Sequence, residues 1–197
     1  MFSYPLSLRF KIIALDSTIY LTDSTGREIL FVKKGFLRLR EKIKIFTDSS
    51  QTNHRFTIST SQIIDLGATY EVTDEEKKMV VFRIKHYGWS FLWRSRYTVL
   101  DLHNQPIAQI KEDNPWIEIL NGFLGEIPYL QILTIWLFNP TYTLTDTAGI
   151  PLLTLKKKPS LFERMFVIEK GQASSLLDED SAVLTALMTV IFQRSRG

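Results

Sequence analysis

The chain contains no cysteine, and this absence excludes several kinds of chemistry together. Disulfides, thiolate metal sites and cysteine nucleophiles are all ruled out. Histidine is scarce as well: His54, His86 and His103 lie far apart, without the spacing of a metal site. No phosphate-binding loop, dinucleotide-binding glycine pattern or serine nucleophile elbow occurs. We therefore expect a protein that is not an enzyme and that uses neither a metal nor another cofactor.

A secretory signal is also lacking at the start of the sequence. Residues 1–5 read Met-Phe-Ser-Tyr-Pro, without the basic segment, apolar run and small-residue cleavage site that such a signal needs. Cytoplasmic residence is therefore expected, either free or peripheral at a membrane surface.

Charge of either sign is in only slight excess, with a formal net charge of +3 over 197 residues. This value is too small to indicate a nucleic-acid partner, and none is expected. The charge is unevenly distributed: residues 1–100 hold sixteen Lys and Arg against ten Asp and Glu, and residues 101–197 hold eight against eleven. Any anion-binding surface is therefore expected in the first half. With 45% hydrophobic and 23% charged residues, the sequence predicts one globular domain over residues 1–197.

A hairpin pattern occurs four times along the chain. In each copy, alternating apolar residues lead to an Asp that can hydrogen-bond to its own turn, and a second strand follows. The copies span residues 19–29, 70–80, 97–107 and 142–152, and their acids are Asp23, Asp74, Asp101 and Asp146. Three residues after the Asp comes a Gly or Asn suited to a positive φ, except in the second copy, which has Lys77. These Asp residues are better explained as turn formers than as acid–base pairs.

Further strands are predicted between the hairpins, at residues 6–15, 36–46, 55–61, 131–138 and 164–169. Residues 94–100 form the first strand of the third hairpin. Residues 114–122 begin with Asn-Pro and end at a Gly, which favours a short helix. The total is about twelve strands, within a closed or nearly closed sheet.

The end of the chain predicts a helix over about residues 178–193 that is apolar on every side. Its polar residues form one thin stripe, Ser181, Thr185 and Thr189, at intervals of four. A helix of this kind must be buried in protein or in lipid. Its uninterrupted apolar part, residues 182–192, would be about 16 Å long, far short of the ~30 Å hydrocarbon core. The sequence therefore predicts a mainly β fold, an antiparallel barrel that encloses this helix.

The hairpins, the segment Phe-Asn-Pro-Thr-Tyr at 138–142 and the apolar C-terminal helix together resemble the tubby C-terminal-like superfamily. Among its members, the chain is most similar to the LURP-one-related proteins and, more distantly, to the phospholipid scramblases. The resemblance covers essentially the whole chain and implies a twelve-stranded barrel around a central helix. Tubby domains bind phosphoinositides, and scramblases are linked to lipid movement and calcium. The resemblance therefore implies a lipid-related function, without site residues to carry over.

Four cations on one predicted strand are the main candidate site. Alternation places Arg38, Arg40, Lys42 and Lys44 on one face of the strand and apolar residues on the other. Alternate cations would lie roughly 6–7 Å apart, a spacing suited to several phosphate oxygens or neighbouring lipid head groups. The secondary candidates are Lys33, Lys34, Lys156, Lys157 and Lys158. The alternative is a solvated outer strand face that carries no ligand.

Two aromatic stretches, residues 87–93 and 116–138, are open to two interpretations: core packing or contact with a membrane interface. Three readings of the function follow. The leading one is a non-enzymatic binding or scaffold domain for anionic phospholipids or other phosphate-bearing ligands. The second is a protein-interaction or regulatory domain, and the third is scramblase-like lipid transport.

Overall fold

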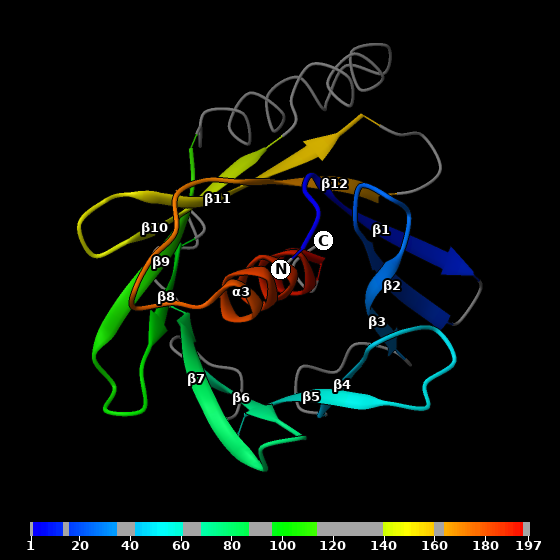
Figure 1. The fold of residues 1–197 in the computed structure, drawn as a ribbon, viewed down its shortest axis with the longest axis horizontal. Coiled ribbons are helices and arrows are strands. Elements are labelled where there is room, and N and C mark those ends of the chain that lie inside the picture. Colours follow the sequence, from blue (N-terminus) through cyan, green and yellow to red (C-terminus); the bar gives the residue numbers. More distant parts are fainter. Residues whose placement is uncertain are drawn as a thin grey trace, which may run out of the picture.

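The computed structural model describes residues 2–13, 16–34, 42–60, 68–86, 96–113, 140–159 and 164–194. In this part of the chain, twelve antiparallel strands close into a barrel, and the helix α3 (Glu179–Arg194) lies inside the ring of strands (Figure 1). The predicted mainly β fold, the strand number and the enclosed helix are confirmed. That residues 1–197 form one domain stays a prediction.

Each strand of the barrel pairs with the next along the chain, and β1 closes the ring on β12. Leu8, for example, lies opposite Leu21 of β2 and Phe166 of β12. Closure leaves no free strand edge in the sheet. The strands are β1 (Leu6–Ile13), β2 (Asp16–Thr22), β3 (Glu28–Lys34), β4 (Ile43–Phe46), β5 (His54–Ser59), β6 (Thr69–Asp74), β7 (Met79–His86), β8 (Arg96–Leu100), β9 (Pro106–Glu112), β10 (Thr141–Asp146), β11 (Pro151–Lys158) and β12 (Arg164–Lys170).

The strand limits differ from the sequence prediction at several places. β1 is described as far as Ile13, so residues 14–15 of the strand predicted at 6–15 lie outside the described residues, and the strand predicted at 36–46 is described only from Ile43 onward. The strand predicted at 131–138 and the helix predicted at 114–122 lie outside the described residues. So do the aromatic stretches 87–93 and 116–138.

The Asp of each predicted hairpin accepts hydrogen bonds from its own turn. In three hairpins the carboxylate accepts from the backbone N–H groups two and four residues later; in the β2–β3 turn, Asp23 accepts from Thr25 and Arg27. The residues at the third position, Gly26, Asn104 and Gly149, have φ of 85°, 62° and 83°. The β6–β7 hairpin, which has Lys77 in place of the Gly or Asn, also has a different turn structure. In the β6–β7 turn, Asp74 accepts from residues two and three positions later, and Lys78 takes the positive φ of 54°.

All these turns lie at one end of the barrel. Strands alternate in direction, so the connections after every even-numbered strand meet at the same end, together with the start of α3. We call this the turn end; its connections are residues 23–27, 47–53, 75–78, 101–105, 147–150 and 171–178. The opposite end, where β3 and β11 finish and β4 begins, is called the far end.

Helix α3 is buried along its length, as its composition predicts. Every residue from Ser181 to Phe192 is at most 6% exposed. Asp178 caps the helix, because its carboxylate accepts a hydrogen bond of 2.7 Å from the Ser181 backbone. No helix in the described part of the chain is long and apolar enough to cross a membrane.

The polar stripe of α3 satisfies its own hydrogen bonds. The Thr185 hydroxyl donates to the Ser181 carbonyl at 2.8 Å, and the Thr189 hydroxyl donates to the Thr185 carbonyl at 2.9 Å. The Thr185 and Thr189 side chains therefore enter the core without needing a partner from the barrel wall. At the far end of the helix, Phe192 packs between aromatic rings, with its centroid 4.4 Å from Tyr70 and 5.3 Å from Tyr97.

Replacing Leu187 with Asp is expected to prevent folding. Leu187 is 0% exposed, and an unpaired charge inside the barrel costs several kcal/mol, which is much of the stability of a typical domain. The same change at Leu176, which is 54% exposed, is the matched control and should shift the thermal unfolding midpoint little. Soluble yield and thermal unfolding check both variants. A folded Leu187→Asp variant with an unchanged midpoint would contradict the enclosed position of α3.

Candidate anion-binding face

The outer surface of β1 to β4 is basic because of strand alternation. In β4, Ile43 and Ile45 are buried in the core, and Lys44 between them is exposed. In β3, Val32 is buried and Lys33 is exposed. The alternation predicted for residues 42–46 is therefore confirmed, and cations point outward from neighbouring strands.

The sheet register aligns three of these lysines in a row across the barrel. Thr18 of β2 lies opposite Lys11 of β1 on one side and opposite Lys33 of β3 on the other. Phe31 of β3 lies opposite Phe46 of β4, so Lys33 and Lys44 both lie two residues from this pair, toward the far end. We call Lys11, Lys33 and Lys44 the basic row. Because neighbouring strands are about 4.8 Å apart, the row spans roughly 14 Å at its backbone.

The basic row has no ion-pair partners in the described part of the chain. Within the described residues, no carboxylate forms an ion pair with any of its three lysines, and none pairs with the exposed Lys42 beside it. Cations held close together without counter-charges attract anions. The row is therefore a surface suited to several phosphate groups at once.

Aromatic side chains lie directly beside the row on the same outer face. Tyr20 of β2, which is half-buried, contacts the buried Phe31 of β3, with ring centroids 5.0 Å apart. Phe46 follows on β4 and is half-buried. The Lys11 ammonium group is 5.3 Å from the centre of the Tyr20 ring, a cation–π contact. Basic and aromatic groups therefore share one surface, as they do at membrane interfaces.

The structure places the residues predicted for this site as follows. Lys42 and Lys44 are exposed at the start of β4. Lys34 ends β3, opposite Ser17 of β2, and its side chain is not described. Arg38 and Arg40 lie outside the described residues, so their part in the site stays a prediction.

The secondary candidates on β11 are partly neutralised. Lys156 forms an ion pair of 2.6 Å with Glu169 of β12. Lys157 is half-buried, and its burial, followed by the nearby charge of Arg164, lowers the pKa of its ammonium group. Lys158 is exposed at the end of the strand. This segment therefore offers less free positive charge than the basic row.

Lys11 was not among the residues that the sequence indicated. It is one of two cations on β1, Arg9 and Lys11, in a segment whose inward residues, Leu6, Leu8 and Phe10, dominate the pattern. Only the pairing of β1 with β2 and of β2 with β3 brings Lys11 close to Lys33. Alternation along β1 was enough to predict that Lys11 points outward. Its closeness to Lys33 could be predicted only with the strand order.

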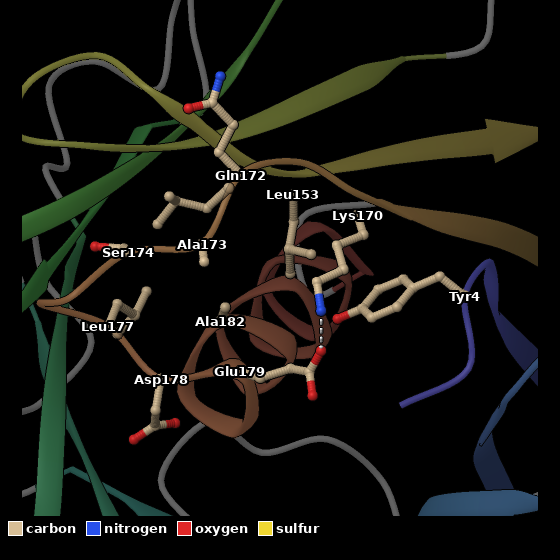
Figure 2. A pocket seen from close by; sticks show the side chains of 11 residues that line it. Tyr4, Leu153, Lys170, Gln172, Ala173, Ser174, Leu177, Asp178, Glu179 and Ala182 are labelled. Atoms are coloured by element: carbon tan, nitrogen blue, oxygen red, sulfur yellow. Dashed lines mark hydrogen bonds and ion pairs between the residues drawn. The ribbon is translucent and has the colours of Figure 1, made fainter. Parts of the chain in front are cut away.

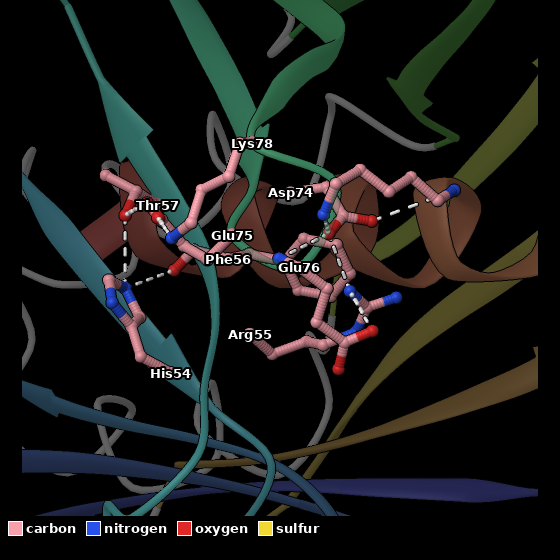
Figure 3. A network of polar contacts seen from close by, with 9 residues as sticks. His54, Arg55, Phe56, Thr57, Asp74, Glu75, Glu76 and Lys78 are labelled. Atoms are coloured by element: carbon pink, nitrogen blue, oxygen red, sulfur yellow. Dashed lines mark hydrogen bonds and ion pairs between the residues drawn. The ribbon is translucent and has the colours of Figure 1, made fainter.

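A second cluster of polar groups lies at the turn end, around the β6–β7 turn (Figure 3). The Thr57 hydroxyl donates a hydrogen bond of 2.6 Å to Glu75 and lies 3.1 Å from His54 Nε2. Lys78 binds the other oxygen of Glu75 at 3.1 Å. These contacts tie β5 to the turn that follows β6. Because the Thr57 hydroxyl already donates its hydrogen to Glu75, we interpret the cluster as a structural support.

Asp74 is the buried centre of that support. Its carboxylate forms an ion pair of 2.7 Å with the Arg55 guanidinium group. The same guanidinium group forms a second ion pair of 3.0 Å with the Glu76 carboxylate. Burial alone would raise the pKa of Asp74. Backbone hydrogen bonds from Lys77 and Glu76, with the charge of Arg55, instead hold that pKa below its ordinary value.

The charged residues at the two ends of the barrel show no metal-binding arrangement in the described part of the chain. Within the residues that the structure describes, no three His, Asp or Glu side chains come together in a group that could hold a metal ion. For the whole chain, the absence of a metal and of an enzymatic activity stays a prediction.

Comparison with known proteins supports the fold and leaves the function open. No family model matches the chain, and no curated protein matches it. Among solved structures, the X-ray structure of a protein from Arabidopsis thaliana is similar, with 12% sequence identity and a TM-score of 0.51. The alignment covers 98% of this chain and 93% of the other. At this identity the likeness shows a shared fold alone.

Replacing Asp74 with Asn is expected to lower the free energy of unfolding by about 2 kcal/mol at neutral pH, because charged hydrogen bonds to Arg55 and the turn are lost. The folded pKa of Asp74 lies below its unfolded value of about 4. Its contribution is therefore present above about pH 4 and is lost as the pH falls through the folded pKa.

Urea unfolding at pH 7 and at pH 3 measures this difference. The gap between the wild type and Asp74→Asn should shrink in acid. Glu76→Gln removes the exposed partner of Arg55 and should lower the free energy of unfolding at neutral pH by less than Asp74→Asn does. Equal stability of Asp74→Asn and wild type at pH 7, or a gap that stays constant in acid, would contradict this role of Asp74.

Proposed function

We propose that this chain is a non-enzymatic binding domain that attaches to anionic phospholipid head groups through the basic row. One observation carries the proposal: Lys11, Lys33 and Lys44 come from three strands to one outer surface, and no described carboxylate pairs with them. The proposal includes membership in the tubby-like superfamily, to which the hairpins and the buried helix point.

The chemistry of this surface suits a lipid bilayer better than a small anion. A row of about 14 Å is wider than one phosphate group and can contact several neighbouring head groups. Each lysine near an anionic membrane contributes about 1 kcal/mol. Tyr20 and Phe46 are half-buried beside the row, and the tyrosine has the amphipathic character that is favoured at the membrane–water interface.

Co-sedimentation with vesicles tests the proposal. Vesicles of phosphatidylcholine alone are compared with vesicles that also contain phosphatidylserine or a phosphoinositide, at low and at moderate salt. Wild-type protein is expected to prefer the anionic vesicles, and added salt should weaken the binding. The variant with Lys11, Lys33 and Lys44 all replaced by Gln should bind on the order of a hundredfold more weakly, from about 3 kcal/mol lost.

The matched control removes the same charge from the other end of the barrel. Arg27, Lys77 and Lys78 are 67%, 64% and 75% exposed at the turn end, and their replacement by Gln gives a protein of equal net charge. This control should bind anionic vesicles nearly as the wild type does. If both triple variants lose the same vesicle affinity, only the net charge of the protein matters. If the variant at Lys11, Lys33 and Lys44 binds as tightly as the wild type, the basic row is not the binding surface.

A free phosphate-bearing molecule is the other source of the same ligand chemistry. Inorganic phosphate and chloride at equal ionic strength distinguish the two sources. If the row contacts a membrane surface, both salts should weaken vesicle binding to the same extent. Specific displacement by phosphate would instead indicate a small-molecule site.

A further inference from the structure

The segment that leads into β1, residues 2–5, crosses the turn end of the barrel toward the start of α3 (Figure 1). We call it the entry segment. Its Phe2 backbone N–H donates a hydrogen bond of 3.1 Å to the Glu179 carboxylate of α3. The side chains of Phe2 and Tyr4 are half-buried and pack against the core. The entry segment therefore fills part of the turn end with two aromatic side chains at alternate positions.

Each of these aromatic side chains borders a pocket that it leaves partly open. Tyr4 borders a pocket of about 210 Å³ between β11, β12 and α3 (Figure 2). Phe2 borders a second pocket of about 120 Å³ between β3, β5 and α3. The apolar walls include Leu153, Leu177 and Ala182 in the first pocket and Leu30, Phe56 and Leu184 in the second. Because α3 lines both pockets, the entry segment runs past its start from one pocket to the other.

Neither pocket alone has the size of a typical ligand site, which is roughly 300–1,000 Å³. If the entry segment left the turn end, the two pockets would join along α3, and the space of the Phe2 and Tyr4 side chains would be added. The joined cavity would fall within the range of ligand sites. Its apolar walls would come from α3 and from opposite sides of the entry segment. The entry segment therefore occupies the position of a ligand.

The fit of the entry segment in this position is imperfect. The Tyr4 hydroxyl oxygen is buried and has no hydrogen-bond partner within the described part of the chain. A hydroxyl buried in this way destabilises the docked arrangement, because it would be hydrogen-bonded to water once the segment left. The open space beside Phe2 and Tyr4 also means that packing contacts are missing there.

The entry segment can leave without disturbing the barrel. Besides the contact of Phe2 with α3, it is held by the Ser24 backbone N–H, which donates a hydrogen bond of 2.9 Å to the Ser3 carbonyl. The paired part of β1 begins only at Leu6, opposite Ile168 of β12. Release of the entry segment therefore breaks few hydrogen bonds and leaves the strand pairing intact, as in a local opening.

We propose that the entry segment is an internal, autoinhibitory ligand, and that the same position binds a segment of a partner protein with aromatic or large apolar side chains two residues apart. The entry segment is the template for this occupant. Two buried side chains anchor it in the pockets, and its backbone donates to Glu179, which Lys170 holds at 2.8 Å. Because the internal segment is linked to the barrel, a partner must fill the pockets better than Phe2 and Tyr4 do.

A peptide titration tests the proposal. The double variant Phe2→Ala/Tyr4→Ala empties both positions, and Ser3→Ala, at an exposed position of the same segment, is the matched control. The probe is the acetylated peptide Phe-Ser-Tyr-Pro, titrated into each protein and followed by NMR. The double variant should bind it about tenfold or more tightly than the wild type and Ser3→Ala do. The peptide Phe-Ser-Phe-Pro should bind the double variant about tenfold more tightly still, because it buries no hydroxyl.

Amide hydrogen exchange is a second test, and it does not need the double variant to fold. The Ser24 amide, which donates to Ser3, should exchange by local opening with a much smaller opening free energy than the Leu8 amide of β1. Tyr4→Phe removes the buried hydroxyl and should slow the exchange of Ser24 about tenfold. Ser24 exchange as slow as that of Leu8, or unchanged by Tyr4→Phe, would show that the entry segment is a fixed part of the fold and would overturn the proposal.

The titration has its own contradicting outcomes. A folded double variant that does not bind the peptide, or that binds it no more tightly than the wild type, would refute the proposed site. Self-association of the wild type that Phe2→Ala/Tyr4→Ala abolishes would also refute it, because the occupant would then be a second copy of this chain. The basic row is intact in all these variants, so failure here leaves the proposed membrane attachment untouched.

Discussion

The burial of α3 on every side is the constraint on which the rest of the structure depends. Every residue from Ser181 to Phe192 is at most 6% exposed, so the helix needs apolar neighbours in all directions. A ring of twelve strands supplies them, and closure of the ring removes the edges that such a sheet would otherwise expose. The helix can enter because its own backbone accepts the hydroxyl hydrogens of Thr185 and Thr189.

A filled barrel leaves only its outer face and its two ends for function. The ends differ because strand direction alternates along the chain. The turn end carries the acids of the hairpins, such as Asp101 and Asp146, together with exposed cations such as Lys78, whereas lysines lie at the far-end limits of β3, β4 and β11. The basic row lies near the far end, on the outer face of the barrel, and a pocket beside the start of α3 lies at the turn end.

Local chemistry explains which parts of the fold were predictable from the sequence. The hairpins were predictable because the Asp and the Gly or Asn act within one turn, as Asp23 and Gly26 show. The helix was predictable because its composition alone requires burial. In the β6–β7 hairpin, where Lys77 replaces the Gly or Asn, the positive φ moves to Lys78, and the strand pairing is kept.

The candidate sites were less predictable, because they depend on contacts between distant segments. Lys44 was indicated by alternation along its own strand, but Lys11 joins Lys33 only through the pairing of β1, β2 and β3. The pocket unites Tyr4, Leu153 and Leu177, which no sequence pattern connects. Strand order and register are therefore the information that the residues alone did not supply.

Amide hydrogen exchange of α3 is the most direct test of the enclosed helix. If the barrel must open before the helix meets water, the amides of Leu184, Leu187 and Met188 should exchange only through global unfolding. Their opening free energy should equal that of Leu8 and Leu144 in the strands and the value from urea unfolding. Exchange of the α3 amides with a markedly smaller opening free energy, while the strands stay protected, would contradict the central claim.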